Sequence, residues 1–176
     1  RVRLAEPLSL PGPCDLAGMR AAGPIVRRML EAMKQAVRPG ITTAELDEVG
    51  ATVMREHGAQ SAPQLVYKFP GVNCISLNDE AVHGIPGGRV VEAGDLVKLD
   101  VPIALDGFMA DAAATVAVGA VSAERRLLIA CAARAFTKAL LVARAGFRVF
   151  EIRRVVDRAL PRCCFSVIRD LCGHGI

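Results

Sequence analysis

The stretch that decides the fold runs from Cys74 to Thr115 and reads CISLNDEAVHGIPGGRVVEAGDLVKLDVPIALDGFMADAAAT. Within it, Asp106-Gly107 separates two apolar runs. This is the strongest short-range signal for a β-hairpin, because glycine accepts the positive φ that a type I′ turn requires. The sequence therefore predicts a hairpin in which Leu105 faces Phe108 and residue 102 faces residue 111.

Two acidic residues come to one face of this predicted hairpin. Side chains alternate along a strand with period two, so Asp100 points the same way as Pro102 and Asp111. The two carboxylates become diagonal neighbours, roughly 7–8 Å apart at the backbone. Such a pair repels unless a cation or hydrogen-bond donors lie between them, and carboxylate oxygens suit hard divalent cations. The pattern predicts either a metal site or a solvated strand face with two unrelated acids.

The opposite face of the hairpin is an ordinary core face. Its residues are Leu99, Val101, Ile103, Leu105, Phe108, Ala110 and Ala112. Helical periodicity flanks the strands and predicts helices over about 15–37, 43–58 and 122–143, with a fourth that Pro161 ends. Thr42-Thr43-Ala44-Glu45 predicts a capping box at the second helix, and residues 61–70 are expected to form a loop. The fold class is therefore α+β with an antiparallel sheet.

Composition limits the class of protein. The 176 residues are 52% hydrophobic, with a net charge of +4 and six cysteines. No apolar run reaches the roughly 20 residues of a membrane span. The first residues of the sequence show no signal-peptide pattern. The cysteines lack the spacing of a disulfide framework or a Cys-x-x-Cys zinc site. These features predict a cytoplasmic protein with reduced thiols, without a membrane partner and without direct nucleic-acid readout.

Three motifs resemble one known family. Asn78 to Pro86 resembles the Asn-x-x-x-x-His-Gly-Ile-Pro segment of type I methionine aminopeptidases. Asp100 and Asp111 stand where that family keeps its first two metal-binding aspartates, with the same separation. The segment 165–176 is similar to the one that carries the family's metal-binding histidine. The motifs follow in the family's order, and the resemblance extends from about Met19 onward.

The resemblance implies the pita-bread fold, an antiparallel sheet backed by two pseudo-symmetric helix pairs. An internal echo agrees with it: the pattern of residues 38–46 recurs at 144–152, each time between two helices. The counterpart of the Cys74–Thr115 stretch would then fall after Ile176. We therefore expect one incomplete catalytic domain over residues 1–176, with a first half at about 14–119 and a partial second half at about 120–176.

The resemblance also implies a metal centre. Asp100 and Asp111 are its carboxylate ligands, Asp111 bridging, and His174 is its imidazole ligand. The family uses two divalent ions, and these ligand types accept Co, Mn, Fe, Zn or Ni. Two further glutamates and a second histidine come from family sequence after the Gly-His-Gly-Ile motif. We expect at most one ion to bind this chain.

Substrate binding is implied at three positions. His83 would donate a hydrogen bond that favours the tetrahedral intermediate, and it is also the expected catalytic residue. Phe69 and Cys74 would line the pocket for the methionine side chain, where Val66 replaces an aromatic residue of the family. The implied activity is removal of the initiator methionine from nascent polypeptide N-termini by metal-activated water. The alternative is an inactive, truncated homologue that acts as a binding module or has no function.

Two contacts with other molecules follow as expectations. Arg153, Arg154 and Arg158 lie away from the inward face of the fourth helix, which makes them either a solvated basic face or a contact with the ribosome surface. The family is monomeric, but an open strand edge favours self-pairing. Self-association is therefore expected if the sheet is incomplete.

Overall fold

The structure of the protein is a computed structural model that describes residues 13–160 and 164–171. These residues fall into two compact units, the first ending at Ala120 and the second beginning at Val121. Each unit is considered by itself. The predicted metal-ligating His174 lies outside the described residues.

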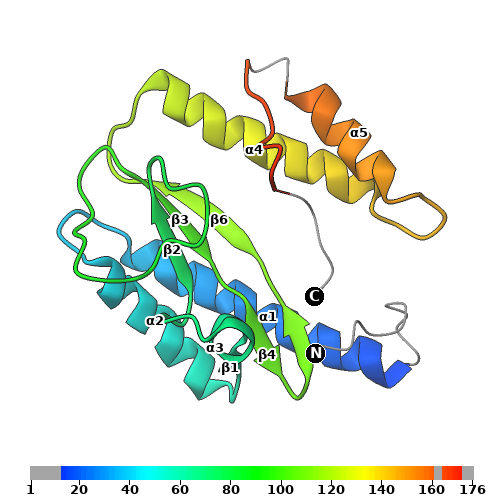
Figure 1. Cartoon of the computed structure of the whole chain (residues 1–176), viewed down its shortest axis with the longest axis horizontal. Coiled ribbons are helices and arrows are strands. Elements are labelled where there is room, and N and C mark those ends of the chain that lie inside the picture. The colour runs from blue at the N-terminus through cyan, green and yellow to red at the C-terminus, as the bar shows by residue number, and fades with distance from the viewer. Residues whose placement is uncertain (1–12, 161–163, 172–176) are drawn as a thin grey trace. The chain divides into compact units, whose positions relative to one another are not determined.

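Two helices open the first unit (Figure 1). They are α1 (Pro13–Ala36) and α2 (Thr43–Glu56). The predicted capping box is confirmed: the Thr42 side chain accepts the Glu45 amide at 3.1 Å, and the Glu45 carboxylate accepts the Thr42 amide at 2.8 Å. These bonds lower the pKa of Glu45. Both helices bury an apolar stripe, to which Met29, Met33 and Leu46 contribute fully buried side chains.

Six strands form two small antiparallel sheets in the first unit. The first sheet has the order β2-β3-β6 and the second β1-β4-β5. Their bounds are β1 Gln60–Ser61, β2 Cys74–Leu77, β3 Leu96–Asp100, β4 Ile103–Leu105, β5 Phe108–Ala110 and β6 Ala113–Ala117. The predicted hairpin is confirmed, since Leu105 pairs with Phe108 and Asp106 and Gly107 have φ values of 50° and 86°.

The predicted long strands are each divided in two, which corrects the expectation of continuous strands over 96–105 and 108–118. The division falls at Val101-Pro102 on one side and at Asp111-Ala112 on the other. Proline has no amide hydrogen for the ladder, and the Pro102 carbonyl instead accepts the Ala62 amide at 3.3 Å. The register nevertheless continues through the break, because Asp100 pairs with Ala113 just as Ile103 pairs with Ala110.

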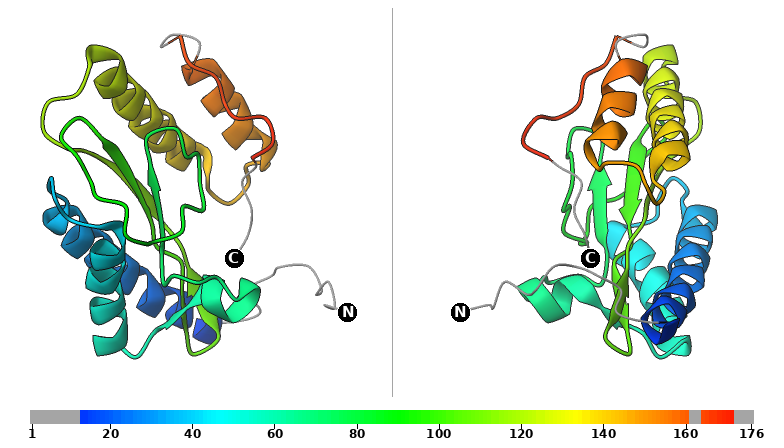
Figure 2. Two further views of the ribbon diagram at one scale, coloured as in Figure 1. Left: turned by 60° about the vertical axis from the view of Figure 1, so that its left-hand side comes forward. Right: turned by 90° about the vertical axis from the view of Figure 1, so that its right-hand side faces the viewer.

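Helices α1 and α2 both lie on one face of these strands, as the two views of Figure 2 show. Leu99, Val101 and Ile103 are fully buried in that layer, as predicted. Ala112 is exposed, however, contrary to its predicted place in the core. It lies in the break between β5 and β6.

A third helix, α3 (Ala62–Tyr67), replaces the predicted loop over residues 61–70. Ser61 caps it by accepting the Gln64 amide at 3.4 Å, and Pro63 lies in its first turn. Ser followed by Pro two residues later is a helix-start pattern. The loop prediction was wrong because the segment is too short to show helical periodicity.

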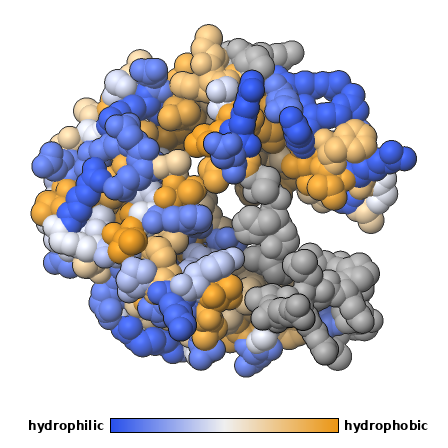
Figure 3. All heavy atoms as spheres, viewed as in Figure 1, coloured by the Kyte–Doolittle hydropathy of each residue, from blue (hydrophilic) through white to orange (hydrophobic). Residues whose placement is uncertain are grey.

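The second unit contains α4 (Ala123–Val142) and α5 (Phe150–Ala159), which pack on each other. Both were predicted, and Ser122 caps α4 by accepting the Arg125 amide at 3.2 Å. Several of the unit's large apolar side chains are exposed, among them Phe136 and Leu141. Apolar (orange) and charged (blue) surfaces lie side by side on the face viewed in Figure 3. Among the described helices, none is long and apolar enough to cross a membrane.

Candidate functional site

The sheet face opposite α1 and α2 carries the two predicted carboxylates. Cys74 on β2, Asp100 on β3 and Ala113 on β6 lie opposite one another across the sheet. Asp111 is two residues from Ala113, so it lies on the same face, diagonal to Asp100. Asp100 is half-buried and Asp111 is exposed. The structure thus places Asp100 at the end of β3 and Asp111 in the break between β5 and β6, at the predicted register.

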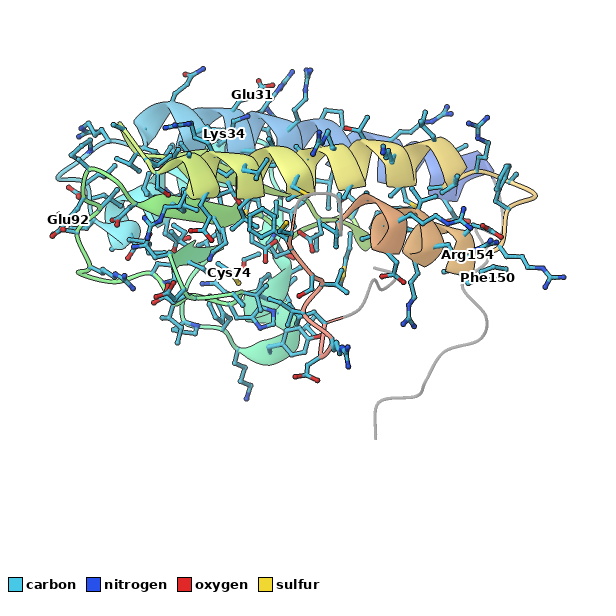
Figure 4. All side chains as sticks on the ribbon, turned by 90° about the horizontal axis from the view of Figure 1, so that it is seen from above. Glu31, Lys34, Cys74, Glu92, Phe150 and Arg154 are labelled. Atoms are coloured by element: carbon cyan, nitrogen blue, oxygen red, sulfur yellow. The ribbon has the colours of Figure 1, made fainter. Side chains whose placement is uncertain are left out.

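The Cys74 side chain lies beside Asp100, on the neighbouring strand and the same sheet face. It is 4% exposed, and Figure 4 shows it in the interior of the first unit. Burial raises the pKa of the Cys74 thiol to about 12, and the negative charges of Asp100, Asp111 and Asp47 add to the effect. A thiol held this way stays protonated at neutral pH and is not a nucleophile. Cys74 is therefore an uncharged neighbour of the two carboxylates.

The carboxylates fit two of the ligands of a divalent ion. Carboxylate oxygens are the donors that such ions take, and the two groups share one face. Three-ligand sites are the minimum found in catalytic zinc centres. Among residues 13–160 and 164–171 no group of three His, Cys, Asp or Glu side chains could hold a metal. The predicted third ligand, His174, lies outside that part of the chain.

His83 lies in an exposed loop between β2 and β3. Its φ is +58°, in the left-handed region that non-glycine residues seldom adopt. The following residue anchors it, because the Gly84 carbonyl accepts the Ile75 amide at 2.9 Å. A Cβ on Gly84 would lie 2.2 Å from the Ile75 oxygen, so only glycine fits this approach. The loop thus brings His83 beside the strand that carries Cys74.

The predicted pocket residue Phe69 is half-buried. It follows Lys68, whose left-handed backbone (φ 55°) ends α3. The α3 side chains Leu65, Val66 and Tyr67 are exposed. The part of Phe69 in a methionine pocket stays a prediction.

The sequence reasoning missed Asp47, which positions the start of β2. The two carboxylate oxygens of this α2 residue accept the amides of Val72 and Asn73 at 2.9 and 2.8 Å, and the Asn73 side-chain amide at 2.8 Å. The partners are too distant in sequence for a local pattern to reveal them. One signal was available: Gly50, in the middle of α2, is a poor helix former there, and a Cβ on it would meet the Asn73 side chain at 2.6 Å.

We expect the Cys74 thiol to resist alkylation at neutral pH. With a pKa of about 12, the thiolate fraction at pH 7 is about 10⁻⁵, and the reaction rate should rise about tenfold per pH unit beyond the ordinary thiol range of about 8.5. Iodoacetamide labelling of the metal-free chain, followed by mass spectrometry, measures this. Exposed Cys164 should react before Cys74. Labelling of Cys74 that levels off near the ordinary thiol pKa would contradict the burial and charge described above.

Known proteins resemble this chain over nearly its whole length. Methionine aminopeptidase 2 of Bacillus subtilis is 42% identical over 163 residues, which are 92% of this chain and 66% of that protein. The methionine aminopeptidase of Clostridium perfringens is 39% identical and is covered over 64% of its length. The chain therefore spans slightly less than two thirds of these relatives.

Solved structures give the same fold. The methionine aminopeptidase of Rickettsia prowazekii matches with a TM-score of 0.88 at 34% identity, over 94% of this chain and 66% of that one. A prolidase from Pyrococcus furiosus matches with a TM-score of 0.75 at 17% identity, which shows the fold alone. The predicted pita-bread architecture is confirmed. Residues 17–176 match the profile of one peptidase family, and the chain belongs to metallopeptidase family M24.

Proposed function

We propose that the protein is a metal-dependent aminopeptidase that removes the N-terminal initiator methionine from nascent proteins. The observation that carries the proposal is the diagonal placement of Asp100 and Asp111 on one sheet face, next to the buried Cys74. Membership in a metallopeptidase family and relatives named methionine aminopeptidase support the reaction class.

Asp100, Asp111 and His174 are the proposed ligands of a divalent ion, one of Co, Mn, Fe, Zn or Ni. When bound, such an ion activates water and polarises the scissile carbonyl. Two ions are proposed for the full-length enzyme and at most one for the 176-residue chain, because the family's further glutamates come after the last of these motifs. Asp100 and Asp111 contribute fixed negative charge that holds the cation at the sheet face.

The substrate side of the site is proposed to consist of His83, Phe69 and Cys74. The exposed His83 can donate a hydrogen bond to the substrate, which favours the tetrahedral intermediate. The protonated Cys74 and the half-buried Phe69 provide apolar surface for an unbranched thioether side chain.

The setting of the protein is also proposed. Nascent polypeptide N-termini as substrates imply a cytoplasmic setting, and residues 1–176 are proposed to form part of one catalytic domain. Contact with the ribosome through α5 receives modest support. Arg153, Arg154 and Arg158 are exposed, but Arg153 pairs with Asp157 at 3.3 Å and Arg154 with Glu151 at 2.9 Å, which leaves less net positive charge on this face.

Self-association is proposed through the outer edge of β5 and β6. Within the described residues, each of these strands pairs on one side only. The edge runs from Phe108 to Ala117 and consists mainly of small side chains, without Lys or Pro to block pairing. Such an edge is a template for another strand. The non-catalytic alternative is favoured by no observation in the described structure.

A chimaera tests the activity. The 176-residue chain alone is expected to release little methionine from Met-Ala peptides, because a single ion lacks its partner. Joining it to the remaining sequence of the B. subtilis relative should restore turnover in Mn or Co. Asp111→Asn in the chimaera should then lower turnover at least about 100-fold, since even outer-shell changes at metal sites lower activity about 10- to 100-fold. Glu48→Gln, on the exposed side of α2, is the control. A chimaera whose turnover survives Asp111→Asn would refute the proposal.

A further inference from the structure

Two polar side chains lie directly opposite each other on the face that carries the carboxylates. They are Ser76 on β2 and Lys98 on β3, one alternation along from the Cys74–Asp100 pair. Both reach the same loop, residues 78–84, at its two ends. The Lys98 ammonium donates to the Asn78 carbonyl at 2.6 Å, and the Ser76 hydroxyl accepts the Gly84 amide at 2.9 Å.

The first end of the loop is tied to β3. Asn78 has a left-handed backbone (φ 51°), and its amide donates to the Leu96 carbonyl at 2.9 Å. Its side chain accepts the Leu96 amide at 3.0 Å and donates to Asp95 at 2.8 Å. These bonds use the amide and side chain of Asn78, and the Lys98 ammonium takes its carbonyl. A bond with a charged donor is stronger than a neutral one.

The second end is docked on β2. Ile75 donates to the Gly84 carbonyl at 2.9 Å, next to the Ser76 bond. Between the two ends, residues 79–83 are exposed. His83 is left-handed, like Asn78. Left-handed non-glycine residues are strained and persist where their surroundings over-determine them. Here the surroundings are the contacts at the two ends.

The Lys98 ammonium is directed at the loop of residues 78–84 and not at the proposed metal ligand Asp100. Lys98 shares a strand and a face with Asp100, so its ammonium could have paired with that carboxylate. It bonds instead to the Asn78 carbonyl, and the acidic groups that act on it are Glu80 and Asp79, both in the loop. Lys98 therefore stabilises the loop by its hydrogen bond to the Asn78 carbonyl.

We propose that Lys98 is a positioning residue for His83: its ammonium holds the Asn78 carbonyl and, with Ser76 at the other end, fixes the loop that presents the imidazole beside the carboxylate face. The consequence for catalysis rests on the proposed function, whereas the positioning itself does not.

The test compares Lys98→Met with Lys98→Arg in the 176-residue chain. Arginine keeps a charged donor, so it should restore what methionine loses. Lys34→Met is the matched control, because Lys34 is an exposed residue of α1. Amide hydrogen exchange over residues 75–84 should be about tenfold faster in Lys98→Met, since a bond with a charged donor is lost. The exchange rate over the same residues should stay within about threefold of wild type in Lys98→Arg and Lys34→Met.

A second readout follows His83 itself. The chain has three histidines, so the His83 imidazole resonance can be assigned with a His83→Gln variant. Lys98→Met should shift or broaden it and leave the His57 resonance unchanged. Unchanged loop exchange and an unchanged His83 resonance would overturn the proposal. Should Lys98→Met not fold, Lys98→Gln, polar but uncharged and shorter, replaces it with the same expectations. The two proposals can fail separately. If Lys98→Met loosens the loop but the chimaera releases no methionine, the proposed function is refuted and the positioning role of Lys98 stands.

Discussion

Asp47→Ala is expected to lower the free energy of unfolding of the first unit by about 3–5 kcal/mol, since each hydrogen bond to a charged group contributes about 1.5–3 kcal/mol. The change removes the acceptor of three N–H groups, two from Asn73 and one from Val72. Asn73 is fully buried, and its side-chain oxygen has no partner within the described structure. Its backbone amide would lose its acceptor next to Cys74, and its side-chain amide would keep only the carbonyl of residue 47, at 3.5 Å. Denaturant unfolding followed by circular dichroism measures the loss.

The neighbouring residue provides the control for this prediction. Glu48 lies next to Asp47 on α2 and pairs with Arg55, with exposed fractions of 66% and 56% for the two side chains. Exposed pairs contribute little, so Glu48→Ala should change stability by no more than about 0.5 kcal/mol. If the two variants unfold alike, Asp47 does not hold the start of β2.

Gly84→Ala is expected to detach the loop that carries His83 and to destabilise the first unit by about 2–4 kcal/mol, as overpacking and the loss of two hydrogen bonds predict. The added Cβ would lie 2.2 Å from the Ile75 oxygen and 2.7 Å from the Ser76 Cα, both backbone atoms that cannot rotate away. The chain must separate there, which breaks the bonds from Ile75 to Gly84 and from Gly84 to Ser76.

Gly88→Ala is the matched control in the same segment. A Cβ on Gly88 would meet nothing within 4 Å, so its unfolding should stay within about 0.5 kcal/mol of wild type. Circular dichroism gives the stability, and hydrogen exchange at Ile75 reports the loop. Protected Ile75 in Gly84→Ala would show that the loop accommodates the methyl group.

Local chemistry made much of the fold predictable from the sequence. The Asp106-Gly107 turn fixed the hairpin register, and period-two alternation then placed Asp100 and Asp111 on one face. The Thr42–Glu45 capping box located the start of α2. Each of these signals acts over a few residues, so it can be read directly from the chain.

The parts that could not be predicted depend on contacts between distant residues. Asp47 on α2 accepts a hydrogen bond from Asn73, and Lys98 on β3 donates one to Asn78, which follows β2. No local sequence pattern marks either partner. The short α3 was missed because one and a half turns give no periodicity. The exposure of Ala112 accompanies its place in the break between β5 and β6, which strand propensity does not encode.

The most direct test of the metal site is calorimetric titration of the metal-free 176-residue chain with Mn²⁺, alongside an Asp100→Asn, Asp111→Asn double variant. We expect weak binding of one ion per chain, which weakens further as pH falls through the carboxylate and imidazole range, because protons compete for the ligands. The double variant should give no binding heat. Two tight sites, or binding that is unchanged when both carboxylates are removed, would contradict the assignment of Asp100 and Asp111 as metal ligands.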